Sequence, residues 1–207
     1  MPMAPVTDPA PRLYLASASP RRHELLTQIG LPHTVLTVPA PPGEDEPQHP
    51  GEAAADYVRR TAREKAERAA LWLAQQELPI LPLLAADTTV ILRGRVLGKP
   101  VDRADAIAML QRLSGATHQV HTAVVLGYEG TLREAVSISE VRMRELSASD
   151  IERYCDSGEP YGKAGAYGIQ GLAGAFVAHL SGSYTGVMGL PLFETANLLR
   201  LAGIHIP

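Results

Sequence analysis

The sequence predicts a compact domain of mixed α/β or α+β architecture, and three observations support this class. Short apolar segments alternate with segments of helical periodicity along the chain. Two of the apolar segments, 118–128 and 131–146, flank the turn residues Glu129-Gly130, which predicts an antiparallel pair of strands. The 207 residues, 45% apolar and 20% charged, are sufficient for one folded domain with a sizeable core.

The first elements follow from apolar runs and from residues that begin and end helices. Residues 13–17 (LYLAS) predict a short strand. In the helix that follows, Ser19 is a candidate N-cap, Pro20 suits the first helical position and Gly30 ends the helix. Residues 33–38 (HTVLTV) predict a second strand.

The central part of the chain predicts a loop, a long helix and a buried strand. Residues 39–52 are rich in proline and acidic residues, which is typical of a surface loop. Residues 53–76 have a helical pattern with many Ala, Arg and Glu. The apolar run 81–92 predicts a strand with a polar interruption, and 93–95 predicts a turn after it.

Helices and a last strand are predicted for the remaining segments outside the strand pair. Helices are expected at 102–115, opened by an aspartate N-cap, and at 147–158, opened by a serine-aspartate pair. Residues 162–174 are rich in glycine, 175–182 (AFVAHLSG) predict a strand, and a final helix is expected at 191–201.

Composition excludes several classes of function. Lys and Arg number 19 against 22 Asp and Glu, so the net charge of −3 disfavours binding to nucleic acid. Cys155 is the single cysteine, which excludes an intramolecular disulfide and a cysteine-based zinc site. The N-terminal residues 1–12 predict a short flexible tail without a secretory signal, and the apolar stretch 78–92 is too short and interrupted to span a bilayer. We therefore expect a cytoplasmic protein that does not enter a membrane.

The junction SASPRR, at the start of the first helix, is a candidate anion site. A helix N-terminus offers unpaired backbone N–H groups and a partial positive charge, and Ser17 and Ser19 add hydroxyl groups. Arg21 and Arg22 lie in the first turn, where cations are unfavourable unless an anion is bound. The alternative is an ordinary capped helix with solvated arginines.

Asp87 and Lys99 are further candidates. An aspartate within an apolar strand is costly to bury unless it is paired or bound to a metal, so Asp87 could hold a divalent cation or orient a water. The alternative is an aspartate that caps a turn through its own backbone. Lys99, between Gly98 and Pro100, could reach a phosphate, although such a lysine is more often a solvated loop residue.

The glycine-rich segment 162–171 could approach a ligand closely because four of its ten residues are glycines. Lys163 adds a charge, and the Gln170 amide can both donate and accept at a base edge. Composition alone favours a mobile glycine loop instead. Asp45-Glu46 could ligate a metal but such residues are usually solvated, and Lys65 on the long helix is most often a surface charge.

Seven ordered blocks, spread from about residue 13 to residue 199, carry a resemblance to a known family. The chain resembles the Maf family of nucleoside triphosphate pyrophosphatases, and within it the subgroup that prefers dTTP and UTP rather than 7-methyl-GTP. The blocks are LYLASASPRRHELL, AREKA, AADTTV, LGKP, LSGATHQVHTAV, GEPYGKAGAYGIQG and GSYTGVMGLPLFET.

The resemblance implies a fold and a reaction. The expected fold is a single domain over 13–207, similar to inosine triphosphate pyrophosphatase, with an elongated mixed sheet flanked by helices and an active-site cleft between two lobes. The expected reaction is hydrolysis of dTTP and UTP to the monophosphate and pyrophosphate with Mg²⁺ or Mn²⁺. Clean-up of nucleotide pools, cell-division arrest and a homodimer are also implied. The alternative is a nucleotide-binding regulator of septum formation that acts through protein partners.

The resemblance also implies roles for individual residues. Asp87 is the expected catalytic residue and, with Glu46, the expected metal ligand. Arg21, Thr88 and Gln170 are expected to influence base choice. Gly162 departs from the pattern, because many relatives have an acidic residue at that position. The expected phosphate-binding residues are Ser17, Ser19, Arg21, Arg22, Lys65, Lys99 and Lys163.

Overall fold

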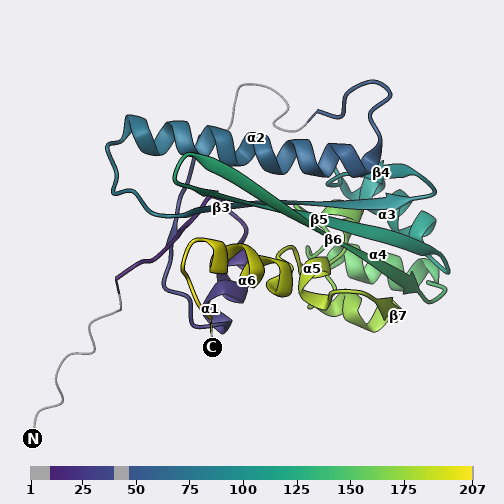
Figure 1. Cartoon of the computed structure of the whole chain (residues 1–207). Coiled ribbons are helices and arrows are strands. Elements are labelled where there is room, and N and C mark those ends of the chain that lie inside the picture. The colour runs from purple at the N-terminus through teal and green to yellow at the C-terminus, as the bar shows by residue number, and fades with distance from the viewer. Residues whose placement is uncertain (1–9, 40–46, 207) are drawn as a thin grey trace, which may run out of the picture.

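A seven-stranded mixed sheet forms the centre of the protein (Figure 1). The computed structural model describes residues 10–39 and 47–206. The strand order is β2-β1-β3-β5-β6-β7, with β4 paired to β3, and β1 is parallel to β2 and β3 whereas the other pairs are antiparallel. The strands are β1 (Tyr14–Leu15), β2 (Thr34–Val35), β3 (Leu83–Leu92), β4 (Arg95–Leu97), β5 (Thr117–Tyr128), β6 (Thr131–Met143) and β7 (Val177–Ser181).

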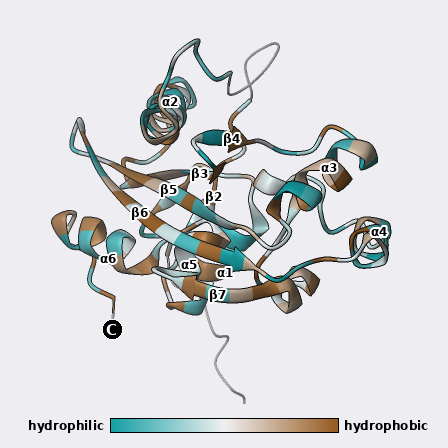
Figure 2. Cartoon of the chain, turned by 90° about the vertical axis from the view of Figure 1, so that its right-hand side faces the viewer, coloured by the Kyte–Doolittle hydropathy of each residue, from teal (hydrophilic) through white to brown (hydrophobic). Residues whose placement is uncertain are grey.

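Helices cover both faces of this sheet (Figures 1 and 2). The long α2 lies on one face, α1, α5 and α6 lie on the other, and α3 and α4 lie together at one end. The prediction of a mixed α/β protein with an elongated sheet flanked by helices is therefore confirmed. The helices are α1 (Pro20–Gln28), α2 (Ala54–Gln75), α3 (Arg103–Leu113), α4 (Ala148–Asp156), α5 (Tyr184–Met188) and α6 (Leu192–Leu201), with 3₁₀ turns η1 (Ala164–Ala166) and η2 (Leu172–Phe176).

Local capping signals agree with the structure at two helices. The Asp102 side chain accepts the Asp105 N–H at 2.8 Å at the start of α3. Ser147 and Asp150 form a capping box at α4. Ser19 is the N-cap residue of α1, but its side chain makes no capping hydrogen bond. The start of α1 is therefore not capped by that side chain, which matters for the site below.

Two hairpin turns place the residues of the strands in register. Gly130 has a φ of 72° and follows Glu129 in the predicted turn between β5 and β6. Arg93 and Gly94, with φ of 51° and 75°, form a similar turn after β3. The sequence pattern predicts this second turn but does not predict β4, whose three residues pair antiparallel with the end of β3.

The face of the sheet opposite α2 carries two apolar cores. One surrounds Leu84 and Val124 and packs on α1 and α6, and the other surrounds Val90 and Val120 and packs on α3 and α4. Between them, three polar side chains lie in register across the strands: Thr88 pairs with Thr122, and Thr122 pairs with Ser137. We call Thr88, Thr122 and Ser137 the polar stripe.

One edge of β3 is uncovered in its middle. On that side β1 pairs only with Leu83 and Leu84, and β4 pairs only from Val90 onwards. Among the described strands none pairs with residues 85–89 on this side, so a gap opens in the sheet. Because side chains alternate along a strand, Asp87 faces α2 and Thr88 faces α5, and both are reached from this gap.

Within the described part of the chain, no helix is long and apolar enough to cross a membrane.

Candidate active site

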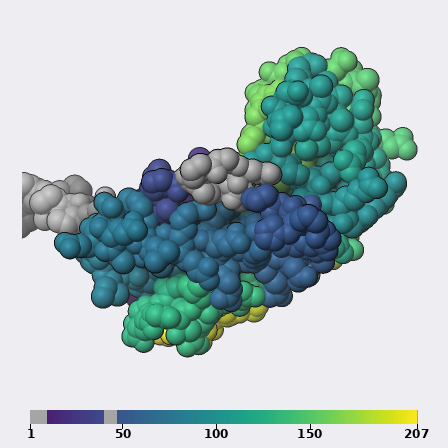
Figure 3. Space-filling model, turned by 90° about the horizontal axis from the view of Figure 1, so that it is seen from above, coloured from purple at the N-terminus to yellow at the C-terminus, as the bar shows by residue number. Residues whose placement is uncertain are grey.

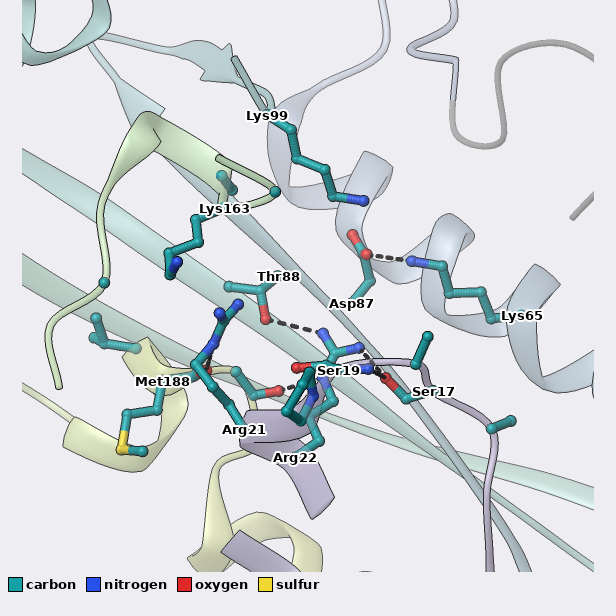
Figure 4. A pocket seen from close by; sticks show the side chains of 18 of the residues that line it. Ser17, Ser19, Arg21, Arg22, Lys65, Asp87, Thr88, Lys99, Lys163 and Met188 are labelled. Atoms are coloured by element: carbon teal, nitrogen blue, oxygen red, sulfur yellow. Dashed lines mark hydrogen bonds and ion pairs between the residues drawn. The ribbon is translucent and has the colours of Figure 1, made fainter. Parts of the chain in front are cut away.

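A cavity of about 470 Å³ fills the gap beside β3 (Figure 4). This is the size range of sites for small molecules and cofactors. Figure 3 shows from above that the part of the molecule with α3 and α4 lies beside one end of α2. The cavity is lined by all the predicted site residues except one: Ser17, Ser19, Arg21, Arg22, Lys65, Asp87, Thr88, Lys99, Lys163 and Gln170. Glu46, with its neighbour Asp45, lies outside the described residues.

Asp87 is a buried and fully paired carboxylate in the middle of β3, with 5% of its surface exposed. Its Oδ1 accepts a hydrogen bond from Lys65 Nζ at 2.7 Å, and its Oδ2 accepts one from Thr61 Oγ1 at 2.8 Å. Burial acts to raise the pKa of Asp87, but the charge and hydrogen bond of Lys65 outweigh it and hold the pKa below its usual value. Asp87 is therefore ionised, and the alternative that it caps a turn is wrong.

Helix α2 supplies both partners of Asp87. Thr61 and Lys65 are four residues apart and so lie on the same face of the helix. The alanines of this face, Ala62, Ala66 and Ala69, are fully buried and let the helix lie close to the sheet. The alternative that Lys65 is a surface charge is wrong, since only 17% of its side chain is exposed. Thr61 was missed, although its spacing from Lys65 was visible in the sequence.

The start of α1 presents hydroxyl and guanidinium groups to the cavity. Ser17 Oγ accepts hydrogen bonds from Ser19 N at 3.2 Å and from Arg22 Nη1 at 3.0 Å. Arg22 Nε donates to Gly189 O at 2.8 Å, and Arg21 Nε donates to Met188 O at 3.2 Å. Carbonyl groups at the end of α5 thus hold both arginines, so the alternative of freely solvated arginines is wrong. No acidic residue lies in the first turn of α1.

Lysines reach the cavity from the opposite wall (Figure 4). Lys99 follows β4, and Lys163 precedes η1. Burial, together with the nearby charge of Arg21, lowers the pKa of Lys163. The ammonium group of Lys163 donates to the carbonyl of Glu159 in its own loop. A bound anion would offset the repulsion between Lys163 and Arg21.

Charge among the described residues that line the cavity is strongly unbalanced. Its lining contains six cationic side chains, and Asp87 is the acidic one among the described lining residues. Such an excess of cations around an ionised carboxylate favours a ligand with several negative charges. The six cations are Arg21, Arg22, Lys65, Arg68, Lys99 and Lys163.

The other part of the cavity is apolar. Val90 and Val120 line it from the sheet, and Val187 and Met188 of α5 line it as well and pack against the same apolar core. Thr88 stands between this apolar part and the cations, and the exposed Gln170 lines the edge. The arrangement suits a ligand with a flat ring at one end and charged groups at the other.

Glu159 organises the glycine-rich segment and was missed by sequence reasoning. Its carboxylate accepts hydrogen bonds from Tyr154 Oη at 2.9 Å, Leu172 N at 2.9 Å and Ala173 N at 3.3 Å. Burial raises the pKa of Tyr154, so this hydroxyl keeps the proton that it donates. Gly168 N donates to the same hydroxyl at 3.2 Å. The segment that carries Lys163 and Gln170 thus forms hydrogen-bonded 3₁₀ turns, whereas its composition alone favoured a mobile glycine loop.

We expect Glu159→Ala to destabilise this wall of the cavity. The change removes three charge-assisted hydrogen bonds and should cost about 2 kcal/mol, or roughly 5 °C in Tm. Thermal unfolding followed by circular dichroism measures the change. The control is Glu152→Ala on the exposed side of α4, which should leave Tm unchanged. Equal Tm values for the two variants would contradict the role of Glu159.

The two histidines of β5, His118 and His121, point to opposite faces of the sheet because side chains alternate along a strand. His118 Nε2 and Tyr167 Oη are 2.8 Å apart, and burial lowers the pKa of His118 to about 4, so this histidine is neutral at physiological pH. His121 lies on the face that α2 covers further along. In the described ranges, no three His, Cys, Asp or Glu side chains gather as a metal-ligating group.

The fold and the cavity together define a class: a mixed α/β protein with a site suited to a phosphorylated ligand around a buried carboxylate. The sequence model of the Maf family, described as Maf-like protein, matches residues 12–202, and the chain belongs to this family.

Curated relatives cover nearly the whole chain. A protein of Bordetella parapertussis named dTTP/UTP pyrophosphatase is 76% identical over 197 residues, 95% of each chain. A protein of Bordetella avium with the same name is 74% identical over 200 residues, 97% of this chain and 100% of the relative. A third, from Cupriavidus metallidurans, is 55% identical over 197 residues, 93% of this chain and 98% of the relative.

Proposed function

We propose that this protein hydrolyses nucleoside triphosphates, with preference for dTTP and UTP, to the nucleoside monophosphate and pyrophosphate. The observation that carries this proposal is the excess of cations around the ionised Asp87, which suits a triphosphate. The names of relatives at 51–76% identity supply the reaction and the nucleotides.

The phosphate-binding residues neutralise charge in this proposal. Arg21, Arg22, Lys99 and Lys163 converge on the cavity from two walls, and Ser17 and Ser19 add hydroxyl groups beside the start of α1. Water attacks the α-phosphorus, the bond to the bridging oxygen breaks, and pyrophosphate leaves with the electron pair, while the proton that the attacking water loses passes to solvent. Fixed cations stabilise the charge that develops on the leaving group, without the reorganisation that water would need.

Asp87 orients the attacking water and serves as a ligand for Mg²⁺ or Mn²⁺ in this proposal. The donor chemistry fits, because Asp87 is an ionised oxygen donor and Mg²⁺ commonly combines one or two carboxylates with substrate phosphates. Glu46 is the second proposed ligand and lies outside the described residues. Bound there, the cation would neutralise phosphate charge and polarise a water. The low pKa of Asp87 makes it a weak base, which favours orientation and ligation over proton abstraction.

Thr88, Gln170 and Arg21 are the proposed determinants of base choice. Thr88 and Gln170 border the apolar part of the cavity, where a pyrimidine ring would lie against Val90 and Val120. A site that forms hydrogen bonds with one base edge rejects a mismatched edge, because buried polar groups would then lose their partners.

The test is product analysis with a panel of nucleotides. Purified protein is incubated with dTTP, UTP, CTP, 7-methyl-GTP or ITP, with Mg²⁺, Mn²⁺ or a chelator, and both pyrophosphate and orthophosphate are measured. We expect pyrophosphate from dTTP and UTP, and loss of release with the chelator. Orthophosphate as the first product would show a phosphatase instead. Nucleotide binding without any release would favour the regulator of septum formation.

We further propose that the protein lies in the cytoplasm, acts as a homodimer, and has roles in nucleotide-pool clean-up and cell-division arrest. These proposals rest on the family resemblance. Sedimentation of the purified protein tests the dimer.

A further inference from the structure

Thr122 of β5 lies directly opposite Thr88 of β3, on the neighbouring strand, and has no role in the proposed site. It is the middle residue of the polar stripe, and 1% of its surface is exposed. Its Oγ1 is 2.8 Å from the carbonyl oxygen of Gly186 and 3.0 Å from Oγ1 of Thr88. Thr88 in turn lines the cavity. Thr122 therefore connects a backbone carbonyl of α5 to a hydroxyl group that faces the ligand.

The direction of these hydrogen bonds follows from proton counting. A hydroxyl group donates one proton, and a carbonyl oxygen only accepts. Thr122 must therefore donate its proton to Gly186, since two oxygens 2.8 Å apart without a proton between them would repel. The 3.0 Å contact with Thr88 then requires Thr88 to be the donor and Thr122 the acceptor.

Thr88 consequently has no proton left for a ligand. Arg22 Nη2 donates to Thr88 Oγ1 at 3.3 Å, and guanidinium groups never accept. Turning the Thr88 proton towards a ligand would break the bond to Thr122 and leave a buried acceptor unpaired, which is costly. Thr88 thus faces the cavity as a hydrogen-bond acceptor.

The Gly186 carbonyl group, at which this series of hydrogen bonds ends, is held firmly in place. Ser183 caps α5 by accepting the Gly186 N–H at 2.9 Å. A Cβ at Gly186 would lie 3.1 Å from both Ser137 Oγ and Ser183 Cβ, so glycine lets the backbone of α5 approach the polar stripe. The Gly186 carbonyl therefore stays within reach of Thr122.

We propose that Thr122 is a positioning residue for base choice: by taking the proton of Thr88, it makes Thr88 an acceptor that selects uracil or thymine over cytosine. Uracil and thymine present an N3–H donor between two carbonyl groups, whereas cytosine presents an unprotonated N3 acceptor. Two acceptors facing each other repel, so cytosine is rejected. This inference rests on the proposed function, because it assumes that the base lies against Thr88.

The test compares Thr122→Val with Thr122→Ser. Valine has the shape of threonine but takes no proton, so Thr88 becomes free to donate to cytosine or to accept from uracil. We expect the ratio of kcat/KM for UTP over CTP to fall about tenfold in Thr122→Val, mainly through a gain for CTP. Thr122→Ser keeps the hydroxyl group and should retain the wild-type ratio. If Thr122 had a merely structural role, Thr122→Val would lower kcat/KM for UTP and for CTP by the same factor.

Binding separates this inference from the proposed function. Calorimetry with α,β-imido analogues of UTP and CTP gives the same ratio without hydrolysis. Suppose that the wild-type protein binds the UTP analogue more tightly than the CTP analogue, that Thr122→Val loses this preference, and that the protein releases no pyrophosphate. The inference then stands and the proposed function fails. An unchanged ratio in Thr122→Val, or wild-type binding of neither analogue, would overturn the inference. If Thr122→Val does not fold, Thr88→Val replaces it as the test. Weaker binding of the UTP analogue with unchanged binding of the CTP analogue supports the inference, and an equal loss of binding for both analogues refutes it.

Discussion

Replacing Asp87 by Asn is expected to lower pyrophosphate release from dTTP and UTP on the order of a thousandfold. The amide keeps the shape of the carboxylate and can still accept a hydrogen bond from Thr61, but it carries no charge. It can neither ligate a divalent cation strongly nor orient water as an anion. Steady-state release of pyrophosphate, measured with saturating Mg²⁺ or Mn²⁺, gives the change in kcat.

The fold should survive this change, which makes the result interpretable. Asn removes a buried charge, and Lys65 lines the cavity, where its ammonium group can be hydrated. The matched control is Asp156→Asn, which removes an exposed carboxylate paired with Arg103 and should leave activity unchanged. A folded Asp87→Asn variant with wild-type turnover would refute the role of Asp87. Retained nucleotide binding in the inactive variant would place the loss in the chemical step.

Elements specified by neighbouring residues could be predicted from the sequence. Asp102 caps its helix through a residue three positions away, and Gly130 adopts the positive φ of a tight turn, which glycine favours. β4 was missed because three residues carry little periodicity, and only pairing with the end of β3 makes them a strand.

Long-range contacts of the site could not be predicted in the same way. Lys65 and Asp87 are 22 residues apart, and the carbonyl groups that hold Arg21 and Arg22 come 167 residues later. The resemblance named most of these residues but not their partners. Thr122 and Glu159 carry no local signal of a role, since each is an ordinary residue of its segment until the fold sets it against the cavity or its loop.

The ion pair between Lys65 and Asp87 predicts the second large effect, this time on stability. Lys65→Met leaves a buried carboxylate without its nearest cation and should reduce the free energy of unfolding by about 3 kcal/mol at pH 7. Chemical denaturation measures it. The control is Lys99→Met, an exposed lysine of the same cavity, which should change stability by less than about 0.5 kcal/mol.

The pH dependence of this effect distinguishes the ion pair from simple packing. In the native protein the pKa of Asp87 is lowered below the unfolded value of about 3.9, so its stabilisation is present above that value and is lost as the pH falls through the folded pKa. Without Lys65, burial would outweigh the remaining help from Arg22 and Thr61 and raise the folded pKa. The contribution of Asp87 would then be lost as the pH rises through that raised pKa.

The difference in the free energy of unfolding between Lys65→Met and the wild type should therefore be large at pH 7 and shrink towards about pH 4. In the Asp87→Asn background the lysine substitution should cost less than about 1 kcal/mol, because no buried charge is left unpaired. An equal loss at both pH values and in both backgrounds would assign the effect to the aliphatic stem of Lys65. Lys65 also lines the phosphate-binding cavity. A coupling between the Lys65 and Asp87 substitutions would therefore mean that a bound triphosphate competes with Asp87 for Lys65, a cation that the fold needs.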